Sequence, residues 1–396
     1  MNEQLLRRAL LEAPLPSQHE AERRGWRIVG AAFRRRAAAP QPRLRPRVAL
    51  AVAVGLLVLV LVLTPAGAKV ADLVEDLVQP GEERPRPALT SLPAPGRLLV
   101  TSARGPWIVA SDGSKRLLGS YQDATWSPHG LFVAATRGRE LTAVEPDGTV
   151  RWSRASRRPV SHPAWSPSGF RIAYLAGHSL RVVAGDGTGD HLLDRRISPV
   201  APAWKATPPA SPAPREIVSY VDADGRVRTI DADSGRKLWR TGSFLTPVRS
   251  VEWSPDGSRL LVVTGSFFTV LGDRGQAIAK GAATGGGPGE LSPDGRRIAI
   301  VRRSPGTAAA RSRLVLSGGH RERRLYAGLG RFGDLAWSPN GEWLLLTWSD
   351  ADQWLFIRPA DDRVMAVAEI SRQFAPGGRG RVPFPHLAGW CCAPIP

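Results

Sequence analysis

Short apolar runs alternate with turn residues along most of the chain. The run RLLVV beginning at Arg259 follows the turn sequence WSPDGS, and RRIAI and RIAYL follow similar turns elsewhere. Runs of this length that are rich in Val, Ile, Leu and Phe and bounded by Gly, Pro, Asp and Ser are typical of β-strands. The pattern predicts an all-β domain over residues 97–396.

One turn phrase recurs through this domain. It is WSPHG from Trp126, WSPSG from Trp165, WSPDG from Trp253, LSPDG from Leu291 and WSPNG from Trp337, with weaker copies at Trp204 and Trp390. Proline presets φ and glycine tolerates a positive φ, so each copy predicts a tight turn between two strands. The turn positions in the clear copies are Pro128, Gly130, Pro167, Gly169, Pro255, Asp256, Gly257, Pro293, Asp294, Gly295, Pro339 and Gly341.

The spacing of the copies predicts a β-propeller. The motif positions lie about 40 to 50 residues apart, and Asp-Gly and Ser-Gly hairpins between them give about four strands per repeat. Each repeat is too small to fold alone and buries its faces only against its neighbours. Seven motif positions favour seven blades, with six as the alternative, and the run from Arg97 to Trp126 is expected to supply the first blade.

These residues also carry a family resemblance. WSPDG followed by RLLVV resembles the repeat of TolB-like and WD-repeat-like β-propellers, and of the propeller domains of prolyl-oligopeptidase-type enzymes. DGRVRTIDADSGRKLWRT is similar to the repeat of quinoprotein-like propellers. The resemblance covers residues 97–396 and implies the fold, with six blades usual among TolB-like members. It implies no single function, because propellers serve many unrelated tasks.

Residues 48–68 form a run without a charged side chain. This run is about as long as a helix must be to cross a bilayer. Arg43, Arg45 and Arg47 precede this segment, and basic flanks remain in the cytoplasm. We therefore expect a single transmembrane helix with residues 69–396 outside the cytoplasm. A cleaved signal peptide ending at Ala68 is the alternative, but the 47-residue leader is longer than such peptides carry.

The segments on either side of this span are expected to have different structures. Trp26, Val29 and Phe33 form an apolar stripe within a basic segment, so residues 1–47 predict a cytoplasmic amphipathic helix. Residues 69–96 predict a juxtamembrane helix followed by a Pro-rich linker that holds the propeller away from the bilayer.

The net charge of +19 favours an anionic partner, although it names none. Nucleic acid is not expected, because the propeller is predicted to lie outside the cytoplasm. Solvated arginines that protect sheet edges are the simpler explanation of the local basic clusters. The candidate contacts for an anionic partner are Arg154, Arg157, Arg158, Arg321, Arg323 and Arg324.

The sequence offers no catalytic, cofactor-binding or metal-binding set. GHSLR at 177–181 lacks the final Gly of a hydrolase nucleophile elbow and falls in a predicted hairpin. The Gly-rich stretches at 185–190 and 281–289 lack the Lys-Ser/Thr of a phosphate loop, and the Asp-rich stretch 222–233 suits turns better than calcium. Cys391 and Cys392 are expected to be small packed residues in preference to a vicinal disulfide.

Two functions from different classes fit this organisation. The first is a membrane-anchored, extracytoplasmic module that binds or scaffolds a protein or a cell-envelope polymer without catalysis. The second is a transmembrane regulator laid out like an anti-sigma factor, with an outer sensor and a short inner effector. Residues 1–47 contain no Cys and so lack the zinc-binding HxxxCxxC pattern of many such regulators.

The predicted orientation can be tested by protease treatment of intact spheroplasts. The propeller should be degraded while residues 1–47 and the anchor survive, because only the C-terminal part is exposed outside. Immunoblotting with antibodies against each end gives the result. A soluble mature form beginning near Lys69 is the outcome that contradicts the anchor.

Overall fold

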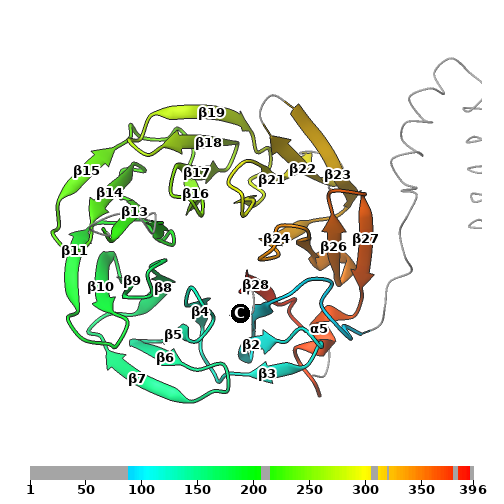
Figure 1. Cartoon of the computed structure of the whole chain (residues 1–396), viewed down its shortest axis with the longest axis horizontal. Helices are drawn as coiled ribbons and strands as arrows, with labels where there is room; N and C mark the ends of the chain where they lie inside the picture. Colours follow the sequence, from blue (N-terminus) through cyan, green and yellow to red (C-terminus); the bar gives the residue numbers. More distant parts are fainter. Residues whose placement is uncertain (1–87, 207–214, 305–310, 319–320, 378–381, 393–396) are drawn as a thin grey trace, which may run out of the picture. The chain divides into compact units, whose positions relative to one another are not determined.

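The computed structural model describes residues 88–206, 215–304, 311–318, 321–377 and 382–392. They form seven four-stranded antiparallel sheets around a common axis, which confirms the seven-bladed propeller (Figure 1). The predicted transmembrane segment and residues 1–47 lie outside the described residues. No helix in the described part is long and apolar enough to cross a membrane.

Blades 2 to 7 are meanders whose strands follow one another outward from the axis (Figure 1). Blades 2 to 4 comprise β4 (Asp123–Trp126), β5 (Val133–Arg137), β6 (Glu140–Val144), β7 (Val150–Ala155); β8 (Val160–Trp165), β9 (Arg171–Ala176), β10 (Ser179–Ala184), β11 (His191–Arg195); and β12 (Ala203–Lys205), β13 (Ile217–Val221), β14 (Val227–Asp231), β15 (Lys237–Arg240). Blades 5 to 7 comprise β16 (Val248–Trp253), β17 (Arg259–Thr264), β18 (Phe267–Gly272), β19 (Ala277–Ala282); β20 (Gly289–Leu291), β21 (Ile298–Ser304), β22 (Arg311–Gly318), β23 (Arg321–Leu329); and β24 (Phe332–Trp337), β25 (Leu344–Trp348), β26 (Gln353–Arg358), β27 (Arg363–Val367). Two short helices, η1 (Ser349–Ala351) and α5 (Ile370–Gln373), follow β25 and β27.

Blade 1 combines strands from both ends of the described chain. Its innermost strand is β28 (His386–Cys391), which pairs with β1 (Arg97–Ser102), followed by β2 (Gly105–Val109) and β3 (Lys115–Leu117) (Figure 1). The expectation that the run from Arg97 to Trp126 forms a whole blade is corrected, because Trp126 ends β4 of blade 2. Because β28 pairs with β1, the ring is closed. β1 then has a hydrogen-bonded neighbour on each edge, β28 on one side and β2 on the other.

The hydrophobic core lies between the blades. Leu98 and Val100 of blade 1 pack with Leu345 and Phe356 of blade 7, and each other pair of neighbouring blades shares a similar cluster. A blade removed from its neighbours would therefore expose apolar surface on both faces. This arrangement explains why the same sequence pattern must recur in every repeat.

The recurrent phrase forms the predicted turn. In WSPDG, the Ser254 hydroxyl accepts a hydrogen bond from the backbone N–H of Arg259 at 3.0 Å, and Gly257 adopts a φ of +67°. The motif residues lie at the last or next-to-last position of the innermost strand in all seven blades: Trp126, Trp165, Trp204, Trp253, Leu291, Trp337 and Trp390. The Trp204 indole donates to the carbonyl of Ala164 in the preceding blade at 2.8 Å, so the motif also links blades.

Basic side chains reinforce these links beside the motif turns. A cation from one blade lies over the motif tryptophan of the next, where it is attracted to the negative face of the ring. The pairs are Arg97 over Trp126 at 5.0 Å, Lys205 over Trp253 at 5.2 Å and Arg297 over Trp337 at 5.3 Å. Part of the positive charge therefore holds the blades together.

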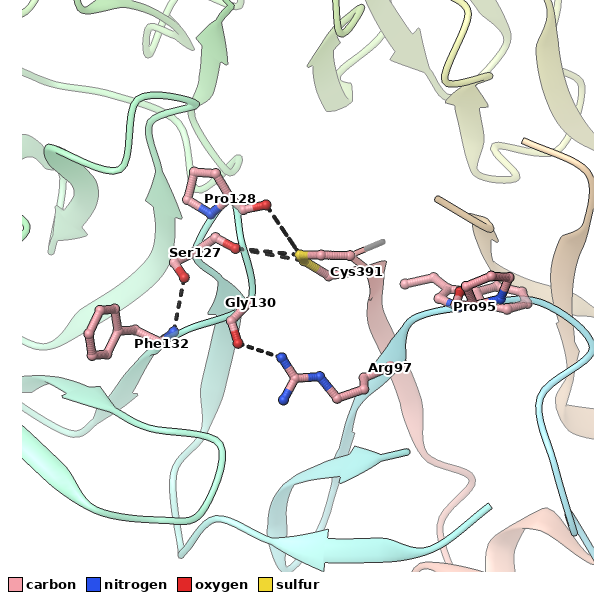
Figure 2. The surroundings of a disulfide bond; sticks show 9 residues. Pro95, Arg97, Ser127, Pro128, Gly130, Phe132 and Cys391 are labelled. Carbon is pink, nitrogen blue, oxygen red and sulfur yellow. Dashed lines mark hydrogen bonds between the residues drawn. A yellow bond between two sulfur atoms is a disulfide. The ribbon is translucent and has the colours of Figure 1, made fainter. Parts of the chain in front are cut away.

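The end of β28 contacts the first motif turn (Figure 2). The structure joins Cys391 and Cys392 in a vicinal disulfide, where we expected unbonded thiols. Both sulfurs converge on the same turn: Sγ of Cys391 lies 3.7 Å from the carbonyl oxygen of Ser127, and Sγ of Cys392 lies 3.2 Å from that of Pro128. Arg97 of β1 donates to the carbonyl of Gly130 in the same turn at 2.6 Å (Figure 2).

Residues 88–96, expected to belong to an extended linker, contact the propeller instead. Leu89, Leu92 and Ala94 are buried in the cluster between blades 1 and 7. The backbone N–H of Leu92 donates to the carbonyl of Ser111 at 2.8 Å. Apolar residues spaced along this segment make its burial favourable, so the described part of the linker belongs to the domain.

Replacing Trp390 with Ala is expected to destabilise the ring strongly. Its buried indole packs edge-on against Phe356 at 5.7 Å and donates to the carbonyl of Pro95 at 3.1 Å. Loss of a buried aromatic ring costs about 3 to 5 kcal/mol. Urea unfolding of the full-length protein measures the change, and Phe170→Ala, at a ring 68% exposed, is the control. Equal stability of the two variants contradicts a tightly packed closure.

Candidate functional site

The antiparallel blades give the propeller two distinct faces. The top face is defined here as the face at which the innermost strands begin, and the bottom face as the one that carries the motif turns. Blade-to-blade connections and loops between second and third strands lie on the top face. In its described loops basic residues outnumber acidic ones, whereas acidic residues outnumber basic ones in the described loops of the bottom face.

One set of predicted arginines meets at a cavity of the top face. Arg154, Arg157 and Arg158 line it from the end of β7 and the loop that follows, and the cavity measures about 440 Å³. Arg181 and Arg195 of blade 3 complete what we call the outer cavity. The sequence did not point to these two, because Arg181 is a single arginine within β10 and Arg195 ends β11 beside Arg196; only the contact between the blades brings them to the first three.

A single carboxylate is buried in the outer cavity. Asp190 accepts hydrogen bonds from Arg154 at 3.0 Å, from Arg181 at 2.6 Å and from the hydroxyl of Tyr174 at 2.7 Å. Burial opposes ionisation of Asp190, but the bonds and charges of these partners outweigh it and hold its pKa below the usual value. Burial and the bond to Asp190 raise the pKa of Tyr174 to about 12.

The remaining cations of the outer cavity are not neutralised in this way. Arg157, Arg158 and Arg195 are exposed and have no carboxylate partner among the residues that the structure describes. Exposed guanidinium groups present planar donors that fit carboxylates and phosphates. The outer cavity can therefore bind an anionic group.

The second predicted set lies elsewhere. Arg321, Arg323 and Arg324 are exposed positions on β23, the outermost strand of blade 6. Arg323 is paired with Asp362 of blade 7 at 2.9 Å. Arg324 lines a different cavity, of about 500 Å³, which also contains Glu322. The two predicted sets thus do not form one site.

Carboxylates on the innermost strands connect neighbouring blades. Each accepts a hydrogen bond from a backbone N–H of the next innermost strand. The pairs are Asp123 with His162 at 2.7 Å, Glu252 with Leu291 at 3.2 Å, Glu290 with Trp337 at 3.3 Å and Asp334 with Leu387 at 2.9 Å. These bonds tie the inner strands together around the axis.

Two of these carboxylates have strongly raised pKa values. Burial raises the pKa of Glu252 to about 8. Burial, together with the charge of Glu252, raises the pKa of Glu290 well above its usual range. Oε2 of Glu290 is buried and accepts no hydrogen bond within the described part of the chain. Both carboxyl groups therefore favour the neutral form near pH 7. The cause is their burial between the innermost strands of the ring.

The other motifs occupy the turns predicted for them. The stretch GHSLR lies in the β9–β10 hairpin, since β9 ends at Ala176 and β10 begins at Ser179. Asp222 accepts hydrogen bonds from the backbone N–H groups of Asp224 and Arg226, as a turn residue does. These positions stabilise hairpins.

No protein-family model matches the sequence, and the comparison with curated proteins gives no match. The C-terminal WD40 domain of Sif2 is similar in structure, with a TM-score of 0.52 and 11% identity over 69% of this chain and 82% of that one. KlHsv2 with loop 6CD replaced by a Gly-Ser linker gives 0.50 and 12% over 68% and 93%. The structural neighbours include WD40-like propellers.

Hydrazine synthase of Kuenenia stuttgartiensis also matches, with a TM-score of 0.47 and 17% identity over 60% of this chain and 76% of that one. At such identities the likeness establishes the fold alone. The TolB-like subtype and the absence of catalysis remain predictions.

Replacing Glu252 with Gln is expected to flatten the pH dependence of stability. The carboxyl stays protonated in the folded protein up to about pH 8, but its ordinary pKa is 4.5. At a pH between these two pKa values, unfolding therefore releases a proton. The free energy of unfolding falls as the pH rises through this range. We expect Glu252→Gln to recover about 1 to 2 kcal/mol of that loss at pH 8.

Urea unfolding of the full-length protein at several pH values measures this effect. Glu369→Gln, at an exposed carboxylate, is the matched control and should follow the parent protein. An unchanged pH slope in Glu252→Gln indicates that the carboxyl is ionised in the folded protein.

Proposed function

We propose that the protein is a membrane-anchored, extracytoplasmic binding module that catalyses no reaction and whose top face binds an anionic partner. Residues 48–68 anchor it, and residues 1–47 remain in the cytoplasm. The partner is a protein or a cell-envelope polymer that carries carboxylates or phosphates. Propellers commonly provide rigid binding surfaces, and the sequence nominates no catalytic group in this one.

The contrast between two groups of basic residues carries this proposal. Arg97, Lys205 and Arg297, which flank the motif turns, lie over tryptophans of neighbouring blades. Arg157 and Arg158 project from the top face without a carboxylate partner among the described residues. Unneutralised charge of one sign on one face attracts ligands of the opposite sign.

The anti-sigma-factor-like regulator is the alternative, with the propeller as outer sensor and residues 1–47 as effector. Photo-crosslinking from the full-length protein in its own membrane separates the two functions. Crosslinkers placed in the top loops capture the partner of a binding module. A sigma factor captured by residues 1–47 supports the regulator instead.

The double variant Arg157→Glu/Arg158→Glu is expected to lose affinity for a fluorescent polyglutamate by about tenfold or more. It removes two cations from the outer cavity and introduces repulsion there. Fluorescence anisotropy with full-length protein in detergent micelles measures binding at two salt concentrations. Added salt should weaken polyglutamate binding by the parent protein more than binding by the double variant.

The control carries the same change of net charge on the other face. Arg236 and Arg274 are exposed residues in bottom-face loops, so Arg236→Glu/Arg274→Glu should retain most of the affinity. Equal losses in the two double variants mean that polyglutamate responds only to net charge, and the proposed surface is then wrong.

A further inference from the structure

A second cavity lies at the top ends of the inner strands of blades 5, 6, 7 and 1. We call it the inner cavity; it measures about 380 Å³ and is lined by Arg249, Ser250, Arg303, Asp334, Ser349 and His386, among others. Its residues come from the starts of β16, β24 and β28 and from the ends of β21 and β25. It is separate from the outer cavity and does not depend on the function proposed above.

The two arginines of the inner cavity have no carboxylate partner within the described residues. Arg249 is exposed on β16. Arg303 donates to the carbonyl of Phe332 at 2.7 Å, while its Nε is buried with no partner in the described part of the chain. A buried donor left without an acceptor is costly. The terminal nitrogens of Arg303 donate to the carbonyls of Phe332 and Gly285, and each has a second N–H that can donate to an incoming anion.

The acidic groups nearby are already engaged. Asp334 accepts the backbone N–H of Leu387 at 2.9 Å and lies 3.5 Å from the His386 ring. Asp350 pairs with Arg331 at 3.5 Å. Burial and, after it, the neighbouring charges of Arg331 and Arg249 lower the pKa of Arg303 and outweigh the opposite effect of Asp350.

Glycines make room for both guanidinium groups. A Cβ at Gly286 would lie 2.8 Å from Nε of Arg249, and one at Gly285 would lie 2.5 Å from Cβ of Arg303. Both glycines have a positive φ, at +63° and +76°, which side chains rarely adopt. Residues 283–288 of the Gly-rich stretch connect β19 to β20, as expected of a turn, and Gly286, Gly287 and Pro288 form part of the cavity wall.

We propose that the inner cavity binds a small ligand bearing an oxyanion, either a phosphate or two adjacent carboxylates, with Arg249 and Arg303 as its main contacts. Arginine forks match either group in a bidentate manner. Ser250, Ser349 and His386 line the same space and can donate further hydrogen bonds to the ligand.

Isothermal titration of the full-length protein in detergent with inorganic phosphate, and separately with citrate, tests this proposal. At least one should bind saturably. Arg249→Ala should weaken it by about tenfold or more through loss of a charge-assisted bond. Arg249→Lys should lose less, because it keeps the charge but not the fork. The preferred anion distinguishes a phosphate ligand from a carboxylate ligand.

Arg139→Ala is the matched control, since Arg139 is also an exposed top-face arginine. It should bind phosphate or citrate as the parent protein does. Arg249 is exposed, so its replacement should leave the unfolding midpoint unchanged, which separates loss of binding from loss of folding. The proposal is overturned if neither anion binds at millimolar concentration, or if Arg139→Ala and Arg249→Ala bind equally.

Discussion

No blade of this propeller can bury its apolar faces without both of its neighbours. Every core cluster spans two blades, so the domain has a single stable arrangement only when the ring is closed. Closure depends on pairing β28 with β1, which joins residues nearly 300 positions apart in the chain. The strand pairing, the indole of Trp390 and the contact of Cys391 and Cys392 with the first motif turn all act at this one junction.

The same constraint explains how positive charge is distributed. Three cations beside the motif turns, Arg97, Lys205 and Arg297, lie over tryptophans of the next blade, where they take part in the packing that holds the ring together. On the top face, the loops that connect the blades contain no recurring tryptophan like that of the motif turns. Arginines such as Arg157 and Arg249 therefore remain available there. A strongly basic composition thus has both a structural and a binding component.

Around the axis, acidic residues of the innermost strands accept hydrogen bonds from backbone N–H groups of the next innermost strand. Burial favours the neutral form of Glu252 and Glu290, whereas Asp334 accepts a hydrogen bond from the backbone N–H of Leu387 and lies 3.5 Å from the His386 ring. Asp334 also lines the inner cavity. The bonds that close the ring and the groups that shape the proposed anion site therefore meet at this residue.

The repeat, its turns and the blade number could be predicted from sequence, because they depend on local chemistry. The backbone preferences of Pro255 and Gly257 and the alternation of the following strand act within a few residues. The assignment of strands to individual blades could not be predicted from the sequence. Only the closed ring assigns Trp126 to blade 2, gives β28 to blade 1 and packs Leu92 against the core. The cavities have the same origin: Arg157 meets Arg195, and Arg249 meets Arg303, across blade boundaries, and such contacts leave no mark in local spacing.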